Sequence, residues 1–263
     1  MQRETNLSAE FILETRGLTK EFKGFVAVND VDLKVRRGHI HALIGPNGAG
    51  KTTFFNLLTK FLNPTAGSIT FNDIDITLEK PAETARRGIV RSFQISAVFP
   101  HMSVLENVRA ALQRNLGTSF HFWKAESSLQ HLHERARQLL AAVDLQDFAD
   151  ELAVNLPYGR KRALELATTL ALEPELMLLD EPTQGMGHED VDRVTQLIKK
   201  VSVGRTILMV EHNMNVVSKI ADRITVLQRG TIIADGTYAE VSKNPLVIEA
   251  YMGTVNTELE GAH

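Results

Sequence analysis

The chain of 263 residues contains no cysteine, few aromatic residues (6%) and little net charge, a formal −3 at pH 7. The absence of cysteine excludes disulfides and thiolate metal sites, and it agrees with a protein that works in the cytosol. The small net charge argues against a nucleic-acid partner, because nucleic-acid binding requires a strongly basic surface.

Long hydrophobic runs are also missing. No apolar stretch approaches the roughly 18 residues that a membrane-spanning helix needs, and residues 1–4 lack a signal-peptide core. We therefore expect any role at a membrane to come through a partner. The hydrophobic content of 43% is ordinary for a soluble enzyme, and the length suits one large α/β domain, with or without a small insertion.

One stretch, residues 44–53 (Ile-Gly-Pro-Asn-Gly-Ala-Gly-Lys-Thr-Thr), fits the phosphate-loop pattern Gly-x-x-x-x-Gly-Lys-[Ser/Thr]. A buried-strand pattern precedes it and helical spacing follows it, which is the context that this motif needs. Its backbone N–H groups can surround phosphate oxygens, while Lys51 is suited to the β and γ phosphates and the Thr52 hydroxyl to Mg²⁺. The predicted nucleotide-binding residues are Gly45, Pro46, Asn47, Gly48, Ala49, Gly50, Lys51, Thr52 and Thr53.

Polar residues follow three later strand patterns. Residues 88–93 end at Gln94, residues 176–179 lead into Asp180 and Glu181, and residues 205–210 lead toward His212. Because ligands of open α/β sheets lie beyond the carboxyl ends of strands, we expect these side chains near one γ-phosphate. Asp180 is expected to hold Mg²⁺, and Glu181 to orient or deprotonate the attacking water. The predicted catalytic residues are Lys51, Gln94, Glu181 and His212, and the predicted metal ligands are Thr52, Gln94 and Asp180.

Strand-like segments precede the phosphate loop, at residues 11–18 and 22–35, with breaks at residues 23–24 and 29–30. Residues 103–143 change to helical character, beginning with a capping-box pattern at Ser103 and Glu106, and indicate a helical insertion between two strands. A cluster of His121, His131 and His133 lacks carboxylate partners at ligand spacing, so we assign no metal to it.

Together these motifs resemble the ATP-binding subunit of an ABC transporter over nearly the whole chain. The resemblance implies that Phe22 stacks on adenine and that the family's signature contacts ATP through Leu156, Pro157, Tyr158, Gly159 and Arg160. Residues 93–108, 185–186 and 244–253 are similar to the ATPases of branched-chain amino-acid importers, in particular to the longer of their two ATPase subunits.

The fold implied by this resemblance is α/β, with a P-loop NTPase (RecA-like) core of mostly parallel strands, an N-terminal antiparallel β subdomain and an inserted α-helical subdomain. We expect one ABC ATP-binding domain over residues 1–263. Its parts are antiparallel β and P-loop core at 11–94, the α-helical subdomain with the signature helix at 95–172, core at 173–236 and a C-terminal helical tail at 237–263.

The resemblance also implies ATP and Mg²⁺ as cofactors and a head-to-tail dimer with a second ABC ATPase subunit, identical or different. The dimer would drive two transmembrane permease subunits, and a periplasmic or extracellular solute-binding protein would act indirectly. We therefore expect a peripheral protein on the cytoplasmic face of the inner (cell) membrane that powers transport of branched-chain amino acids or similar small polar solutes. The ATPase of a lipid or lipopolysaccharide exporter and a non-transport regulatory ATPase stay open as alternatives.

The signature departs from the family's usual Leu-Ser-Gly-Gly-Gln, because Pro157 replaces the serine, Tyr158 the first glycine and Arg160 the glutamine. Proline offers neither a hydroxyl nor an N–H to the partner's γ-phosphate, whereas Arg160 would restore positive charge there. Gly187 also stands where the family has Asp or Asn. We hypothesise a weakened surface toward the partner's ATP; the alternative is that the substitutions are tolerated with little effect.

Overall fold

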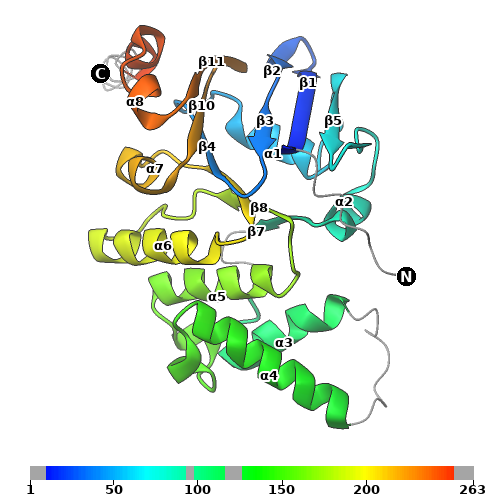
Figure 1. The fold of residues 1–263 in the computed structure, drawn as a ribbon, viewed down its shortest axis with the longest axis vertical. Helices are drawn as coiled ribbons and strands as arrows, with labels where there is room; N and C mark the ends of the chain where they lie inside the picture. Colours follow the sequence, from blue (N-terminus) through cyan, green and yellow to red (C-terminus); the bar gives the residue numbers. More distant parts are fainter. Residues whose placement is uncertain (1–9, 93–97, 116–125, 252–263) are drawn as a thin grey trace.

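The structure, a computed structural model, describes residues 10–92, 98–115 and 126–251. Two sheets organise these residues (Figure 1). A six-stranded sheet has the order β11-β10-β4-β9-β8-β7, and a five-stranded sheet has the order β2-β1-β5-β6 with β3 beside β1. The six-stranded sheet lies between the five-stranded sheet on one side and helices α3, α4 and α5 on the other.

The six-stranded sheet is parallel except at one edge, where β11 pairs antiparallel with β10. Its strands are β4 (Ile40–Ile44), β7 (Ile89–Ser92), β8 (Leu176–Asp180), β9 (Thr206–Val210), β10 (Arg223–Gln228) and β11 (Thr231–Gly236). All residues of β4 and β9 are buried, which agrees with their mostly apolar sequences, since parallel strands are covered on both faces.

The five-stranded sheet is antiparallel throughout. Its strands are β1 (Phe11–Phe22), β2 (Phe25–Val31), β3 (Lys34–Arg36), β5 (Ala66–Phe71) and β6 (Ile74–Asp75). The predicted break at residues 23–24 is the turn between β1 and β2, but the predicted break at residues 29–30 lies inside β2. There Asp30 has a positive φ of 51°, and the register with β1 shifts between Leu18 and Lys20, so local irregularities interrupt the alternation without ending the strand.

The helices follow in chain order. They are α1 (Lys51–Leu58), α2 (Pro81–Arg87), α3 (Val104–Asn115), α4 (Glu126–Ala142), α5 (Tyr158–Leu170), α6 (His188–Val201), α7 (Met214–Ile220) and α8 (Tyr238–Val241), with short 3₁₀ turns at Gln146–Phe148 and Ala153–Asn155. The capping box predicted at the start of α3 is confirmed, because the Ser103 N–H donates to Glu106 and the Glu106 N–H donates to the Ser103 hydroxyl.

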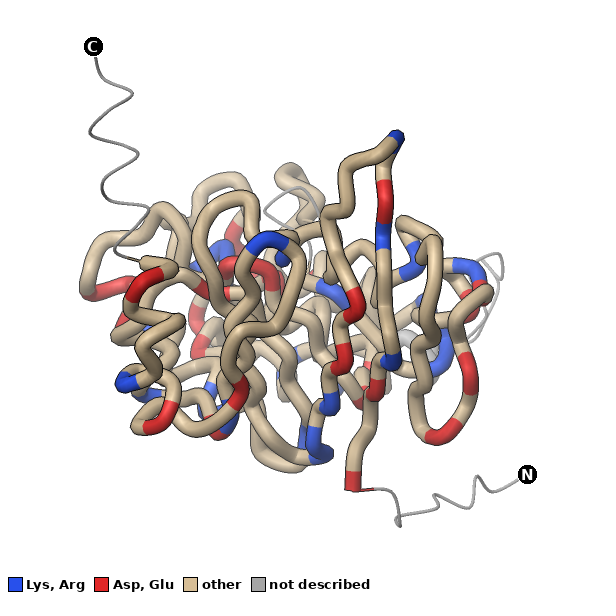
Figure 2. The backbone as a smooth tube through the Cα atoms, turned by 90° about the horizontal axis from the view of Figure 1, so that it is seen from above, with Lys and Arg blue, Asp and Glu red and all other residues tan. Residues whose placement is uncertain are grey.

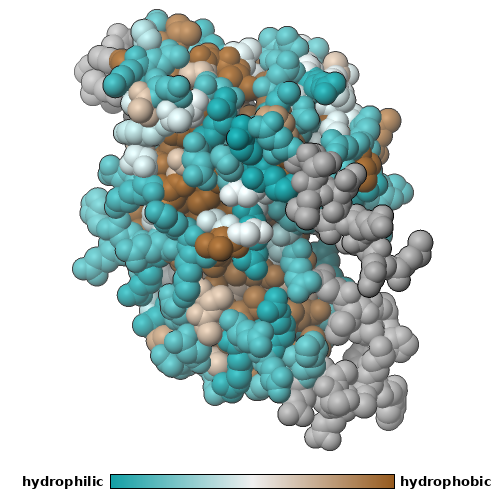
Figure 3. Space-filling model, viewed as in Figure 1, coloured by the Kyte–Doolittle hydropathy of each residue, from teal (hydrophilic) through white to brown (hydrophobic). Residues whose placement is uncertain are grey.

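Side-chain alternation along the parallel strands divides the core in two. Leu208 and Val210 of β9 join a cluster with α1 and the antiparallel sheet, whereas Ile207 and Met209 join a second cluster with α3 to α7. In the space-filling view, apolar surface shows across the middle of the molecule, between the sheets and the lower helices (Figure 3). The parallel sheet therefore holds both halves of the molecule together.

The predicted α/β fold is confirmed: the core sheet is mostly parallel, the N-terminal sheet is antiparallel, and α3, α4 and α5 are inserted between β7 and β8. The domain boundaries at residues 94, 172 and 236 stay predictions. Lys and Arg are interspersed with Asp and Glu over the described chain (Figure 2). None of its helices is long and apolar enough to span a bilayer.

Candidate nucleotide-binding and hydrolysis site

The phosphate loop connects β4 to α1 and is fixed by close backbone contacts. A Cβ at Gly45 (φ 151°) would lie 2.1 Å from the Leu227 carbonyl oxygen, and one at Gly50 (φ 101°) would lie 2.4 Å from the Ala27 carbonyl oxygen. The Ala49 carbonyl also accepts a hydrogen bond of 2.9 Å from the Gly230 N–H. Only glycine fits at the first two positions, so β2 and β10 determine the shape of the loop.

Lys51 places its ammonium group inside this loop. Its Nζ donates to the carbonyl oxygens of Gly45 (2.7 Å) and Pro46 (3.0 Å). Burial lowers the pKa of Lys51, while the negative charges of Glu181 and Asp180 act in the opposite direction. Asn47, Gly48 and Thr52 are exposed, and a Cβ at Gly48 would meet no atom within 4 Å, so this side of the loop is open to a ligand; Pro46 and Thr53 are half-buried beside it.

The predicted acidic residues lie at the same edge of the sheet. In the parallel ladders Val210 of β9 pairs with Leu43 on one side and with Asp180 on the other, so β4, β9 and β8 end level with one another. The phosphate loop, His212 and Glu181 follow directly. The structure thus brings Lys51, Asp180 and Glu181 within electrostatic reach, with His212 exposed at the adjoining strand end. Gln94 lies outside the described residues.

Arg91 of β7 also lies at this end of the sheet, and the sequence did not identify it as part of the site. Its Nη2 forms an ion pair with Oδ2 of Asp180, and its Nη1 donates to Oδ1 of Asn56 at 2.7 Å. The Arg91 and Asp180 side chains are 12% and 16% exposed, so the pair is partly shielded from water. A charged residue inside an otherwise apolar strand was the only sequence signal. The guanidinium holds Asp180 in one orientation through a charge-assisted hydrogen bond.

Glu211 is a second missed residue. It directly follows β9 and its side chain is 0% exposed. The carboxylate accepts hydrogen bonds from Thr183 and from the backbone of His212 and Asn213. The sequence shows a carboxylate directly before the predicted catalytic residue His212. No pattern in the neighbouring residues indicated that this side chain is buried.

The signature residues surround the start of α5. Leu156 is buried, and Pro157 occupies the N-cap position without a side-chain capping bond. The Tyr158 hydroxyl donates to the Gln184 carbonyl oxygen and accepts from Nη2 of Arg162, both at 3.1 Å. The hydroxyl therefore connects this helix to the loop that follows Glu181.

The two remaining signature residues also contact their own subunit. A Cβ at Gly159 would lie 2.5 Å from Oδ1 of Asp190, so α5 and the start of α6 approach closely at this glycine. The guanidinium of Arg160 lies 3.8 Å from the centre of the Phe148 ring, in a cation–π contact. Its predicted role toward a partner's phosphate stays a prediction, since in this chain the cation is engaged by Phe148.

Phe22 ends β1 and faces Phe25 across the turn. Its side chain is 41% exposed, and Nζ of Lys20 lies 5.1 Å from its ring centre. An exposed aromatic ring at a strand end has a free face for stacking, which is compatible with the predicted adenine contact.

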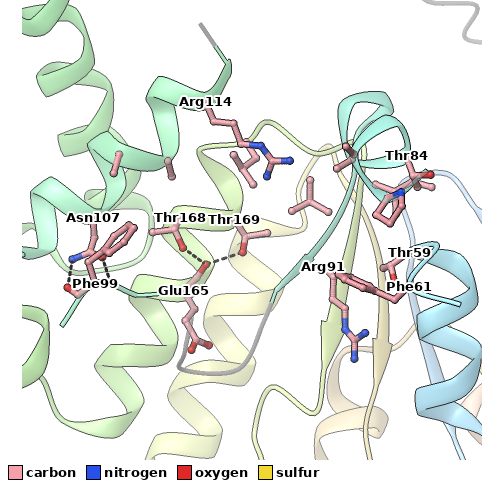
Figure 4. A pocket seen from close by; sticks show the side chains of 18 residues that line it. Thr59, Phe61, Thr84, Arg91, Phe99, Asn107, Arg114, Glu165, Thr168 and Thr169 are labelled. Atoms are coloured by element: carbon pink, nitrogen blue, oxygen red, sulfur yellow. Dashed lines mark hydrogen bonds between the residues drawn. The ribbon is translucent and has the colours of Figure 1, made fainter. Parts of the chain in front are cut away.

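A groove of about 600 Å³ lies beside this edge of the sheet, between α1, α2 and β7 on one side and α3 and α5 on the other. Figure 4 shows Thr59, Phe61 and Arg91 on one wall and Asn107, Thr168 and Glu165 on the other. Phe61 and Phe99 are more than half exposed at the groove. Burial raises the pKa of Glu165, while its ion pair with Arg162 opposes the shift. Arg91 lines the groove and also pairs with Asp180.

The comparison with known families agrees with this geometry. A family model described as ABC transporter matches residues 28–184, from β2 through the signature helix and the Asp180-Glu181 pair. The chain belongs to the ABC transporter family. A second model, described as branched-chain amino acid ATP-binding cassette transporter, matches residues 231–255 of this ABC ATPase. The family and ATPase predictions are thereby confirmed, and cassettes of this family bind nucleotide.

Individual relatives cover almost the whole cassette. The high-affinity branched-chain amino acid transport ATP-binding protein BraF of Pseudomonas aeruginosa is 40% identical over 249 residues, 92% of this chain and 98% of the relative. The corresponding LivG protein of Escherichia coli K12 is 38% identical over 252 residues, with the same coverage. The ADP conformation of MJ1267, an ATP-binding cassette of an ABC transporter, superposes with a TM-score of 0.82 at 31% identity, covering 93% of this chain and 100% of that one.

Proposed function

We propose that this ATPase powers an importer of branched-chain amino acids or similar small polar solutes, through two permease subunits and from the cytoplasmic face of the membrane. The proposed catalytic function is supported by one observation. The strands β4, β9 and β8 end level with one another, and Lys51, Asp180, Glu181 and His212 lie at or just beyond their carboxyl ends. The solute class is supported by the names of the relatives and by the family model over residues 231–255.

The residues present fit a magnesium-bound triphosphate. The Thr52 hydroxyl and the Asp180 carboxylate are hard oxygen donors, which Mg²⁺ prefers, and one or two such groups suffice when phosphates supply the rest. Arg91 holds Oδ2 of Asp180, and no hydrogen bond from the described residues engages Oδ1. The metal would neutralise charge on the β and γ phosphates. Lys51 and the open N–H groups of the phosphate loop hold the phosphate chain in position.

In this proposal Glu181 acts on the attacking water. Its N–H donates to the Val210 carbonyl oxygen at 2.9 Å, and its positive φ of 46° turns the chain sharply away from β8. A carboxylate in this position orients or deprotonates the water, which contributes roughly 10² to 10⁴-fold to the rate. His212 lies at the adjoining strand end and contacts the γ-phosphate in this proposal, with Gln94 completing the set.

A second ATPase subunit, identical or different, completes the site with its signature helix. In this chain that helix presents Pro157, which has no hydroxyl to offer, and an Arg160 that is engaged by Phe148. We therefore favour a heterodimer in which this chain supplies the weaker contact to its partner's ATP. Tyr158 remains available to organise the loop after Glu181.

The groove is the docking place for a cytoplasmic helix of one permease subunit. Its lining is largely apolar, and Phe61 and Phe99 expose rings that a helix can cover. The same groove contains Arg91, whose guanidinium pairs with Asp180. A helix docked there therefore lies one side chain away from the predicted metal ligand, which provides a short route from permease to ATP.

Reconstitution tests the whole proposal. The ATPase is co-purified with its partner ATPase and its permease subunits, and ATP-dependent accumulation of labelled leucine is measured in proteoliposomes supplied with the solute-binding protein. Glu181→Gln serves as the matched variant: we expect ATP binding within about threefold of wild type and almost no turnover or uptake. A variant that keeps more than about a tenth of the ATPase rate contradicts the base assignment. ATP-dependent release of leucine or of lipid instead of leucine uptake contradicts the importer.

A further inference from the structure

Glu211 lies between the two loops that carry Glu181 and His212. It directly follows β9, and its own N–H approaches the Leu43 carbonyl oxygen of β4 at 3.4 Å. The residue is 0% exposed, so its carboxylate faces inward among the strand ends. Because burying a carboxyl group without hydrogen-bond partners is costly, its neighbours must supply those partners.

The two carboxylate oxygens serve different loops. Oε1 accepts from the backbone N–H of Thr183 at 3.1 Å and from the Thr183 hydroxyl. Oε2 accepts from the backbone N–H groups of His212 at 2.9 Å and Asn213 at 3.0 Å. Each carboxylate oxygen thus binds groups of one loop, Oε1 those of Thr183 and Oε2 those of His212 and Asn213. The buried side chain therefore connects the two loops through four hydrogen bonds.

This arrangement fixes the spacing of the two predicted catalytic loops. Thr183 stands two residues after Glu181. The Glu181 N–H donates a hydrogen bond to the carbonyl oxygen of Val210, the residue that precedes Glu211. His212 is the next residue after Glu211 in the chain. We propose that Glu211 is a positioning residue that holds the Glu181 loop and the His212 loop in register for ATP hydrolysis. This inference rests on the proposed roles of Glu181 and His212.

The substitution Glu211→Gln separates this role from simple packing. The amide keeps the size of the side chain but accepts on one oxygen only, so its NH₂ group faces two donors and one loop loses its anchor. We expect the turnover rate to fall about 10 to 100-fold, while ATP affinity stays within about threefold of wild type. In the nucleotide-free protein, the Thr183 amide or the His212 and Asn213 amides should exchange hydrogen at least tenfold faster.

Thr183→Val keeps the proposal testable if Glu211→Gln does not fold. It removes only the hydroxyl that binds Oε1, so we expect a threefold to tenfold loss of turnover. Thr195→Val is the matched control, since Thr195 is another buried threonine, bonded to the Val191 carbonyl oxygen within α6. The control should keep wild-type turnover. Wild-type turnover and amide exchange in both Glu211→Gln and Thr183→Val would overturn the proposal.

A double variant distinguishes action through His212 from a general loss of structure. If Glu211 acts by placing His212, adding Glu211→Gln to His212→Ala should reduce single-turnover hydrolysis much less than it does in wild type. An equal loss in both backgrounds contradicts the positioning of His212 by Glu211. If Glu181→Gln and His212→Ala both keep ATPase activity, the proposed catalytic site is wrong. If these two variants are inactive but Glu211→Gln hydrolyses ATP at the wild-type rate, only the inference about Glu211 is refuted.

Discussion

The two surfaces that are predicted to face ATP in a dimer are held in different ways. The phosphate loop is clamped by backbone, with Gly45 and Gly50 pressed against the carbonyl oxygens of Leu227 and Ala27. The start of α5 is held by side chains, through the Tyr158 hydroxyl and the ring contact of Arg160. A glycine pressed against a backbone carbonyl accepts no side chain, whereas a surface held by side chains can change one residue at a time. The departures from the family pattern at Pro157, Tyr158 and Arg160 lie on that second surface.

The largest effect is expected at Gly50. Gly50→Ala would push a methyl group onto the Ala27 carbonyl oxygen and distort the phosphate loop, so ATP affinity should fall by about 100-fold or more. Gly38→Ala is the control, because Gly38 has a similar positive φ of 77° but no atom within 4 Å of its Cβ. The control should lose about 1 kcal/mol of stability and bind ATP normally. Titration with a fluorescent ATP analogue measures the affinity of both variants. An equal loss of affinity in Gly50→Ala and Gly38→Ala would contradict the special role of the contact at Gly50.

A smaller effect, on stability, is expected at Lys60, which lies just after α1. This side chain is unfavourable both for the local backbone conformation and for its buried surroundings. Lys60 has φ 61°, its Nζ is buried with no hydrogen-bond partner, and burial lowers its pKa to about 8 against the raising effect of Asp75 and Glu79. Lys60→Gly should therefore stabilise the fold by about 1 to 2 kcal/mol at pH 7.

The gain at Lys60 should depend on pH. The folded protein binds this proton more weakly than the unfolded chain, so the wild-type penalty is complete below pH 8 and fades as pH rises from about 8 to 10.5. Urea unfolding at pH 7 and pH 10 measures the difference. Lys23→Gly is the control, since Lys23 is exposed with φ 48° and its gain should be the same at both pH values. An unchanged gain for Lys60→Gly at pH 10 contradicts the buried-amine explanation.

Tyr158→Phe tests the side-chain-held surface. It removes the hydroxyl that joins Arg162 of α5 to the Gln184 carbonyl oxygen, so stability should fall by about 1 kcal/mol. ATP hydrolysis should fall a few-fold, because the loop after Glu181 loses an anchor. Tyr238→Phe is the control, with an exposed ring at the start of α8. Chemical denaturation and steady-state ATPase assays give both numbers, and a Tyr158→Phe protein identical to the control would remove this anchor from the account.

The smallest change in stability is expected for Pro157→Ser. Serine provides an N-cap acceptor for α5, which stabilises the fold by about 1 kcal/mol. Loss of the proline makes the unfolded chain more flexible and offsets part of this gain, so the free energy of unfolding should rise by only about 0.5 kcal/mol. Hydrolysis in the assembled dimer should nevertheless increase, if Pro157 weakens the contact to the partner's ATP. Unchanged ATPase activity would mean that the substitution is simply tolerated.

The sequence was most informative where function depends on backbone. The glycines of the phosphate loop and the strands that end at Asp180 and Val210 follow local rules, so both the fold and the site edge were predictable. Arg91 and Glu211 were not, because their partners lie on neighbouring strands or loops that meet only after the sheet forms. The same holds for Tyr158 and Gln184, which are 26 positions apart.

Arg91 has one further consequence. The same side chain lines the groove and forms an ion pair with Asp180, so in the proposed docking mode the coupling between a permease helix and the predicted metal ligand passes through one guanidinium. Asn56 and Phe55 of α1 also contact this guanidinium. Substitutions at these two positions are therefore expected to change the strength of the coupling without touching either ATP or the permease helix.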